Sequence, residues 1–344
     1  MFFFFKKSKI PKEWLGCKIE PPDARDYKLR EVFKSLPLFD WQKGYDIEEE
    51  IGIKIPVKNQ GQSSSCVGQS WSYYSGILEH IETNFYRDHS ARFIYSQIYL
   101  QEGGAYLRDG GQILIKQGSV PSVLMPDYKT ETEMRKNNDL TKDLVGVARV
   151  YLKGAYLDIS NFYDINSFAS IIAMNKGMVS GVFDSFDNTW RTAYPKPSGE
   201  KRMGHALYFG KAKMINGKKY LGVLNSWGEE VGDKGWQWLG EEWFITGKIM
   251  FPKTIIDLPS EIERPKEKPK HYFGNDLFYG TKNKEVEILQ KCLAYEGLFL
   301  YPTFTDYFGG YTLRAVKAFQ AKYGLAINGF VNSETRKKLN EIFS

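Results

Sequence analysis

The chain has 344 residues, with 42% hydrophobic and 15% aromatic side chains and a formal net charge of +6. These values are typical of a globular protein with enough chain for more than one domain, and they exclude a disordered or fibrous protein. The positive charge is mild and contains no block of basic residues. It therefore excludes an obvious nucleic-acid-binding protein and only weakly favours polyanionic surfaces such as a cell wall.

The N-terminus begins "MFFFFKKSK", with the apolar run ahead of the lysines. A secretory signal peptide has the reverse order, and no stretch of the chain reaches transmembrane length. We therefore expect no membrane span and no standard signal peptide, so that work outside a cell would need another export route. Residues 1–35 continue as a charged, proline-containing arm ("KIEPPDARDYKLREVF") with little periodicity.

Helical patterns come first in the section from residue 36 to residue 257. A buried helix of about four turns is predicted after three serines that supply caps. Its apolar face consists of Val67, Trp71, Tyr74, Ile77, Leu78 and Ile81. The stretches "SARFIYSQIYL" and "DGGQILIKQG" predict further helices.

Beyond residue 145 the pattern changes to strands. The segments "GVARVYLKG", "MVSGVFD", "HALYFGKAKMI" and "KKYLGVLNSW" are rich in β-branched and aromatic residues, and "INGKK" predicts an Asn-Gly hairpin turn. Helices followed by strands predict an α+β fold with an antiparallel sheet.

The C-terminal part begins with a linker at residues 258–277, where proline and charge are dense ("LPSEIERPKEKPKHYFGNDL"). Residues 278–344 then show three short amphipathic helices joined by glycine-containing turns. We expect Cys292, on the first of these helices, to be a core residue. The three cysteines of the chain lie far apart and are odd in number, which indicates no disulfide framework.

Cys66 falls at the N-terminus of the buried helix, where unpaired amides and the helix dipole favour an anion. We therefore expect its thiol to ionise more readily than a free cysteine. A thiolate nucleophile needs a base, and the chain has only four histidines. His80 lies near the far end of the same helix, His89 in a charged loop and His271 in the linker. Only His205 begins a strong strand.

The predicted hairpin brings a third residue to this site. A turn centred on Asn216-Gly217 would set position 208 opposite 225, so that Asn225 lies close enough to His205 to orient its imidazole. Gln60, on the loop that enters the buried helix, would join the Cys66 amide in stabilising an oxyanion. Each residue also has a simpler interpretation as packing or turn, and only their joint spacing favours catalysis.

Three segments resemble the signature blocks of the papain-like cysteine peptidases: "PVKNQGQSSSCVGQSW", "GHALYFG" and "LNSWGEEVGDKGWQWL". The resemblance covers residues 36–257 and implies a two-lobed domain, with a helical lobe and an antiparallel β lobe. It implies that Cys66 is the nucleophile, His205 the general base and acid, Asn225 its orienting partner, and Gln60 the oxyanion donor.

The resemblance also implies substrate-binding roles for Gly103, Gly104 and Trp227, the last covering the His–Asn hydrogen bond from solvent. Two positions depart from the family pattern. Ser63 stands where secreted relatives have a disulfide cysteine, and Val67 replaces the aromatic residue after the nucleophile. No long helical propeptide precedes the domain, so the arm at 1–35 would act as a clamp over the cleft, as a short propeptide that is trimmed, or would pack elsewhere.

In the tail, "EVEILQKCL", "DYFGGYTLRAVKAFQAKYGL" and "NGFVNSETRKKL" resemble the three-helix peptidoglycan-binding domain of cell-wall hydrolases. The resemblance covers residues 278–344 and implies a small all-α domain whose partner is peptidoglycan.

The sequence therefore predicts a cysteine endopeptidase, a hydrolase of peptide bonds, held at a bacterial wall by its C-terminal domain. One alternative is a hydrolase of peptidoglycan stem or bridge peptides, from a phage or a bacterium. Another is a catalytically silent wall-binding or virion-structural protein. No cofactor is expected, and no metal, because no cluster has ligand spacing. The expected location is the bacterial cell wall, the extracellular space or a virion.

Overall fold

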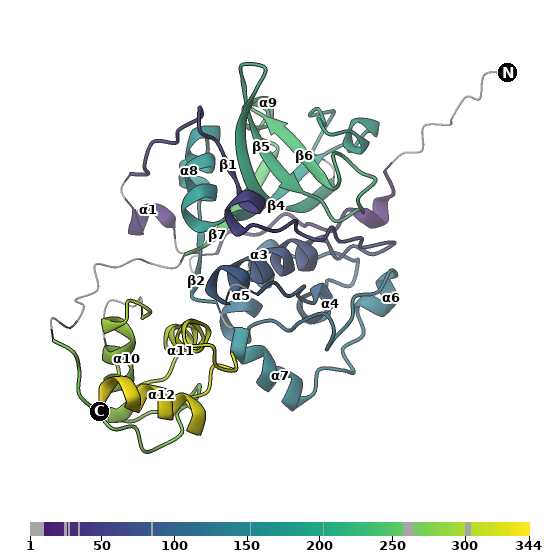
Figure 1. The fold of residues 1–344 in the computed structure, drawn as a ribbon. Helices are drawn as coiled ribbons and strands as arrows, with labels where there is room; N and C mark the ends of the chain where they lie inside the picture. Colours follow the sequence, from purple (N-terminus) through teal and green to yellow (C-terminus); the bar gives the residue numbers. More distant parts are fainter. Residues whose placement is uncertain are drawn as a thin grey trace.

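The computed structural model describes most of the chain. The described residues are 10–23, 26, 28–33, 35–83, 85–151, 153–201, 203–256, 265, 267–299 and 304–344. The phenylalanine run at residues 2–5 and part of the predicted linker lie outside these ranges. The described residues form a helical half, a sheet half packed against it, and a group of C-terminal helices (Figure 1). No helix in these ranges has the length and apolarity to cross a membrane.

The helical half is built around α3 (Cys66–Thr83), whose predicted apolar face is buried except near its end, where Ile81 is 43% exposed. α4 (Ala91–Tyr95) and α5 (Leu107–Lys116) pack against α3. The short helix α2 (Ile47–Ile51) precedes them. The remaining short elements are η1 (Lys12–Trp14), α1 (Leu29–Val32), α6 (Glu131–Met134), η3 (Ser160–Phe162), η4 (Asn188–Arg191) and α9 (Glu242–Ile245).

The strand predicted in "GVARVYLKG" is wrong. That segment, residues 146–154, contains the end of α7 (Lys142–Ala148) and the 3₁₀ turn η2 (Arg149–Tyr151), and the strand β2 (Ala155–Asp158) begins directly after it. The hydroxyl of Thr141 caps α7 by accepting a hydrogen bond from the amide of Leu144. This N-cap satisfies a helix-end donor and outweighs the weak strand preference of the two valines.

The sheet half is a seven-stranded sheet in the order β2-β7-β3-β4-β5-β6, with β1 also paired to β4, and every pairing is antiparallel. Its remaining strands are β1 (Tyr45–Asp46), β3 (Met178–Asp184), β4 (Met203–Ile215), β5 (Lys218–Leu224), β6 (Trp236–Gly240) and β7 (Ile249–Ile256). β3 is buried along its whole length because it contacts α3 and α8 (Ile165–Asn175). The α+β prediction is confirmed.

The predicted hairpin joins β4 to β5. Asn216 and Gly217 both have positive φ, 49° and 75°, as a type I′ turn requires. The predicted register is off by one residue, because Tyr208 faces Leu224 rather than Asn225. The register shifts at Gly210, between Phe209 and Lys211, and such a bulge adds one residue to one strand without a partner on the other.

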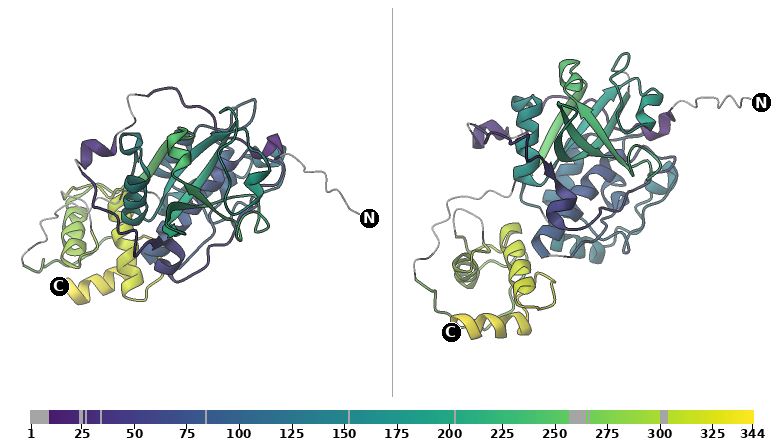
Figure 2. Two further views of the ribbon diagram at one scale, coloured as in Figure 1. Left: turned by 90° about the horizontal axis from the view of Figure 1, so that it is seen from above. Right: turned by 45° about the horizontal axis from the view of Figure 1, so that its top comes forward.

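The C-terminal part consists of α10 (Lys284–Tyr295), α11 (Gly310–Lys322) and α12 (Ser333–Phe343), which enclose their own apolar core with Cys292 in it. α11 packs against α3 of the helical half. In both views of Figure 2, α11 lies on the side of the C-terminal helices that faces the helical half. The ammonium of Lys317, on α11, lies 4.0 Å from the ring centre of Tyr151 in η2.

Candidate active site

Cys66 is the first residue of α3 and is fully buried. The backbone amides of Ala206, Gly16, Val67 and Cys66 itself favour its thiolate, as the helix-end argument predicts. Burial outweighs them and raises the pKa of the thiol to about 11. The expectation of an easily ionised thiol is therefore wrong for this state of the protein, because a covering segment excludes water from the sulfur.

His205 and Asn225 are joined by a hydrogen bond of 2.9 Å between Nε2 of the ring and Oδ1 of the amide. His205 lies on β4, and Asn225 directly follows β5, the neighbouring strand. Both side chains are fully buried. His205 is followed on β4 by Ala206, whose amide reaches the Cys66 thiol. The fold thus brings the histidine, the asparagine and the cysteine to one place.

The imidazole of His205 is held in its neutral form. Burial lowers its pKa to about 4, although the hydrogen bond to Asn225 and the backbone of Trp14 both favour the protonated ring. Nδ1, the ring nitrogen that does not face Asn225, has no described partner at the distance and angle of a regular hydrogen bond, although the backbone of Trp14 acts on the ring. Trp227, 1% exposed, lies with its ring centre 4.4 Å from that of His205 and covers the pair.

Gln60 is fully buried, and its main-chain amide donates to the carbonyl of Ser226, the residue after Asn225, at 2.8 Å. Its Oε1 accepts a hydrogen bond of 2.7 Å from the hydroxyl of Ser226, which fixes the direction of the amide. Its Nε2 donates to the carbonyl oxygens of Ser63, at 2.5 Å, and of Trp14, at 3.3 Å. The amide that the sequence predicts as an oxyanion donor already holds a carbonyl oxygen here.

Residues 15–18 of the N-terminal arm cross the site outside any helix, with Leu15 in an extended conformation. The amide of Cys17 donates to the carbonyl of Gly204 at 2.9 Å, next to His205 on β4. On the other side, the amide of Ala105 donates to the carbonyl of Gly16 at 2.8 Å, and the amide of Lys18 donates to Ala105 at 3.1 Å. The arm is therefore paired with both walls of the site and covers Cys66.

The predicted substrate-binding glycines lie along this path. Gly104 has φ +79°, and a Cβ there would come within 2.2 Å of the Gly16 carbonyl, so the close approach of the arm requires glycine. Gly103 has φ +87°, and a Cβ there would meet only ordinary contacts. Ala105, which was not predicted, makes the two main-chain hydrogen bonds to Gly16 and Lys18 of the arm. Its position directly after a glycine pair is the only signal for it in the sequence.

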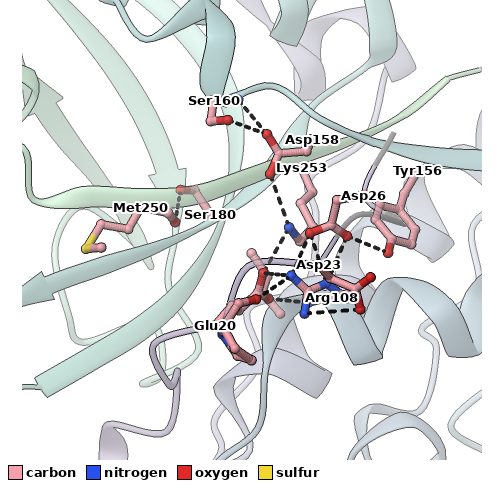
Figure 3. Close-up of polar contacts among 12 residues, drawn as sticks. Glu20, Asp23, Asp26, Arg108, Tyr156, Asp158, Ser160, Ser180, Met250 and Lys253 are labelled. Carbon is pink, nitrogen blue, oxygen red and sulfur yellow. Dashed lines mark hydrogen bonds and ion pairs between the residues drawn. The ribbon is translucent and has the colours of Figure 1, made fainter. Parts of the chain in front are cut away.

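Beyond the site, the arm is anchored by a cluster of charges (Figure 3). Arg108 of α5 pairs with Asp26 at 2.6 Å, and its main-chain amide donates to the carboxylate of Glu20. Lys253 of β7, which is fully buried, pairs with Glu20 at 3.0 Å and with Asp158 at 3.6 Å. Sequence reasoning missed this cluster because charges in an irregular segment normally indicate a solvent-exposed arm.

The three cysteines, Cys17, Cys66 and Cys292, are free thiols. Within the described part of the chain, no group of three or more histidine, cysteine, aspartate or glutamate side chains is arranged to hold a metal ion. The chemistry available at the site is that of a thiol, an imidazole and amide donors.

The fold resembles solved structures of cysteine proteases. Xylellain, a cysteine protease from Xylella fastidiosa, is 22% identical and aligns over 72% of this chain and 97% of its own, with a TM-score of 0.58. The proform of the ragweed pollen cysteine protease Amb a 11 is 16% identical over 66% of this chain and 72% of its own, with a TM-score of 0.52. The chain has a papain-like cysteine-protease fold.

A third papain-like structure, procathepsin L 3 from the larval midgut of Tenebrio molitor, is 16% identical over 67% of this chain and 74% of its own, with a TM-score of 0.51. A search of curated proteins found no match. Residues 282–339 match the family of a peptidoglycan binding domain, and they include α10, α11 and most of α12. The papain-like fold is thus followed by a peptidoglycan-binding domain, and both resemblances stated from the sequence are confirmed.

Proposed function

We propose that the protein is a cysteine peptidase of bacterial walls, and that its arm holds it in a latent form. The observation that carries this proposal is the hydrogen bond of 2.9 Å between His205 and Asn225, at a site that also contains Cys66 and Gln60. A nucleophile, a base and an orienting amide form the arrangement needed for covalent acyl transfer.

In the reaction, Nδ1 of His205 takes the proton of the Cys66 thiol, and the thiolate attacks the carbonyl carbon of a peptide bond. Gln60 Nε2 and the Cys66 amide hold the oxyanion that forms. The imidazolium then protonates the leaving amine, and a thioester remains on Cys66. Water, deprotonated by His205, hydrolyses the thioester and restores the thiol.

The direction of the arm supports its latency. The leaving amine must lie toward His205, which protonates it, so the carboxyl side of a substrate runs past His205 and Trp227. Its amino side then runs along Ala105. The arm places Trp14, whose ring centre is 5.2 Å from that of Trp227, before Lys18, which pairs with Ala105. The arm therefore runs opposite to a substrate, and no bond of it is presented for attack.

The peptidoglycan-binding domain favours a substrate at the wall, because binding nearby raises the local concentration of enzyme. The leading substrate is a protein chain, since the site binds the arm as an ordinary peptide with main-chain hydrogen bonds. The second candidate is a stem or bridge peptide of peptidoglycan itself, which the C-terminal domain favours. A wall or virion location follows from either.

The test compares the two substrates on the full chain carrying Arg108→Gln, which loosens the arm, with and without Cys66→Ala. Denatured casein and purified sacculi are incubated with each protein, and new amino groups are counted. Release that Cys66→Ala abolishes supports the proposal, and the ratio between substrates identifies the preferred one. No release from either, although Cys66 is readily alkylated, would show a silent binding or structural protein.

A further inference from the structure

Gln237 is a fully buried polar residue that the reaction above does not use. It lies on β6, opposite Val223 of β5, a residue of the apolar core of the sheet half. Its Oε1 accepts a hydrogen bond of 2.8 Å from Nδ2 of Asn225. Its Nε2 donates to the main-chain carbonyls of Trp190, at 2.7 Å, and Thr192, at 3.0 Å. Its side-chain hydrogen bonds to described residues thus end either on Asn225 or on the segment around η4.

These contacts determine the direction of every hydrogen bond up to the histidine. A carbonyl oxygen can only accept, so the amide nitrogen of Gln237 must face Trp190 and Thr192. Its oxygen then faces Asn225, whose nitrogen must donate to it. The oxygen of Asn225 is left facing His205, where it accepts from Nε2 at 2.9 Å and from the Ser226 amide at 2.7 Å. Nε2 therefore carries the proton.

We propose that Gln237 is a positioning residue that fixes His205 in the tautomer able to act as a base. With the proton on Nε2, the unprotonated Nδ1 is available to the Cys66 thiol. A turned Asn225 amide would instead offer N–H to Nε2, the proton would move to Nδ1, and the ring could not take a proton from sulfur. This inference rests on the proposed function, because it assigns His205 the role of base.

Replacing Gln237 by a residue that is a poor hydrogen-bond acceptor breaks the series of hydrogen bonds that runs from Gln237 through Asn225 to His205. Gln237→Leu leaves the Asn225 amide nitrogen buried without an acceptor, a cost comparable to a lost hydrogen bond and its desolvation. Gln237→Met keeps the length of the side chain and offers only a weak thioether acceptor. The hydrogen bond from the Ser226 amide to Oδ1 would then be the remaining contact that opposes a half-turn flip of the Asn225 side-chain amide. We expect His205 to populate both tautomers, and kcat for peptide hydrolysis to fall about tenfold or more, with KM unchanged.

The test is nitrogen NMR of the histidine rings in the full chain at neutral pH, where burial keeps His205 neutral. With only four histidines in the sequence, the His205 signals are assigned from their absence in His205→Ala. Wild type is expected to show one tautomer, with the proton on Nε2. Gln237→Leu and Gln237→Met are expected to show a mixture, as is Asn225→Ala. Leu239→Val, a buried change on the same strand at a position that faces Leu221 and has no amide to bond Asn225, is the matched control.

A wild-type ring with its proton on Nδ1 would overturn the proposal even if no variant folded. So would a single Nε2-protonated tautomer in a folded Gln237→Leu or Gln237→Met protein. The tautomer is measured without any substrate. A protein that shows the expected tautomers but hydrolyses no peptide therefore contradicts the proposed function and not the placement of the proton.

Discussion

The arm is held in two different ways along its length. Its cleft segment, residues 14–18, is bound through main-chain hydrogen bonds to Gly204 and Ala105 and through the contact of Trp14 with Trp227. Its anchor segment, residues 20–23, 26 and 28, is bound through the side-chain charges of Glu20, Asp26 and Lys28. Main-chain pairing tolerates most side chains, whereas a buried charge depends on its partner. The cleft segment thus covers the site through main-chain contacts that most sequences could make, and the charges of the anchor segment hold it there.

The largest effect on the arm is expected from replacing Arg108, the cation that pairs with both Glu20 and Asp26 of the anchor segment. Arg108→Gln leaves Asp26 buried without its ion-pair partner, and breaking a buried pair in this way costs about 3–5 kcal/mol. We expect alkylation of Cys66 by iodoacetamide to become at least about 100-fold faster, measured by peptide mass spectrometry. Arg336→Gln, which breaks a pair with Asp276 in the C-terminal domain, is the control. An unchanged rate in Arg108→Gln would show that the cleft segment holds the arm alone.

The cleft segment is tested by one methyl group. Gly104→Ala places a Cβ 2.2 Å from the Gly16 carbonyl, so the arm must move away, and we expect Cys66 alkylation to accelerate about tenfold. Gly52→Ala has a similar positive φ, +70°, but open space around the Cβ, and so separates backbone strain from the clash. Equal effects of the two substitutions on Cys66 would contradict the contact with the arm.

Lowering the pH is expected to strengthen the contact that Glu20 makes in the anchor segment, rather than to weaken it. Burial raises the pKa of Glu20, although Lys253 and Arg108 both oppose the shift. A carboxyl whose pKa is higher in the bound arm than in the free arm takes up a proton on binding, so falling pH strengthens this contact. Amide hydrogen exchange of Lys18, corrected for its intrinsic rate, should slow a few-fold in wild type relative to Glu20→Gln as the pH falls from 7 toward 4. Faster exchange in wild type at acid pH would contradict this sign.

Salt is expected to have the smallest effect. The pair between Lys253 and Glu20 is shielded from solvent, and counterions screen buried pairs far less than exposed ones. We expect Cys66 alkylation in wild type to change less than about twofold between 0.05 and 0.5 M sodium chloride. A rise of tenfold would show that the anchor is held by exposed charges.

The sequence predicted the parts of the fold that depend on local chemistry. Asn216-Gly217 predicted the hairpin because a type I′ turn requires positive φ at both residues. The register needed the bulge at Gly210, which has no local signal, since a glycine within a strand is compatible with either register. The segment at 146–154 was predicted as a strand because of its valines. The Thr141 cap that favours a helix lies five residues before this segment and is identified only by its hydrogen bond to Leu144.

At the site, the sequence predicted the residues but not their environment. Cys66, His205 and Asn225 were identified by their spacing and resemblance, and the fold brings them together. Burial of Cys66 by the arm was one of three possibilities that the sequence left open, because the charges of Glu20 and Asp26 look the same whether a cation or water faces them. Gln237 also gave no signal, because its role depends on two carbonyls from a distant segment.

The packing of α11 on α3 joins the C-terminal domain to the helical half and also determines how far that domain lies from Cys66. The charge of Lys317, on α11, is felt by Glu79, which lies thirteen residues along α3 from Cys66, about 20 Å at 1.5 Å per residue. In this structure, the contact between α11 and α3 holds the C-terminal domain against the helical half. If it grips the glycan mesh as proposed, the thiol can reach only those bonds that lie at a set separation from the gripped strand, so the geometry of the mesh would select the site of cutting before any side chain is recognised.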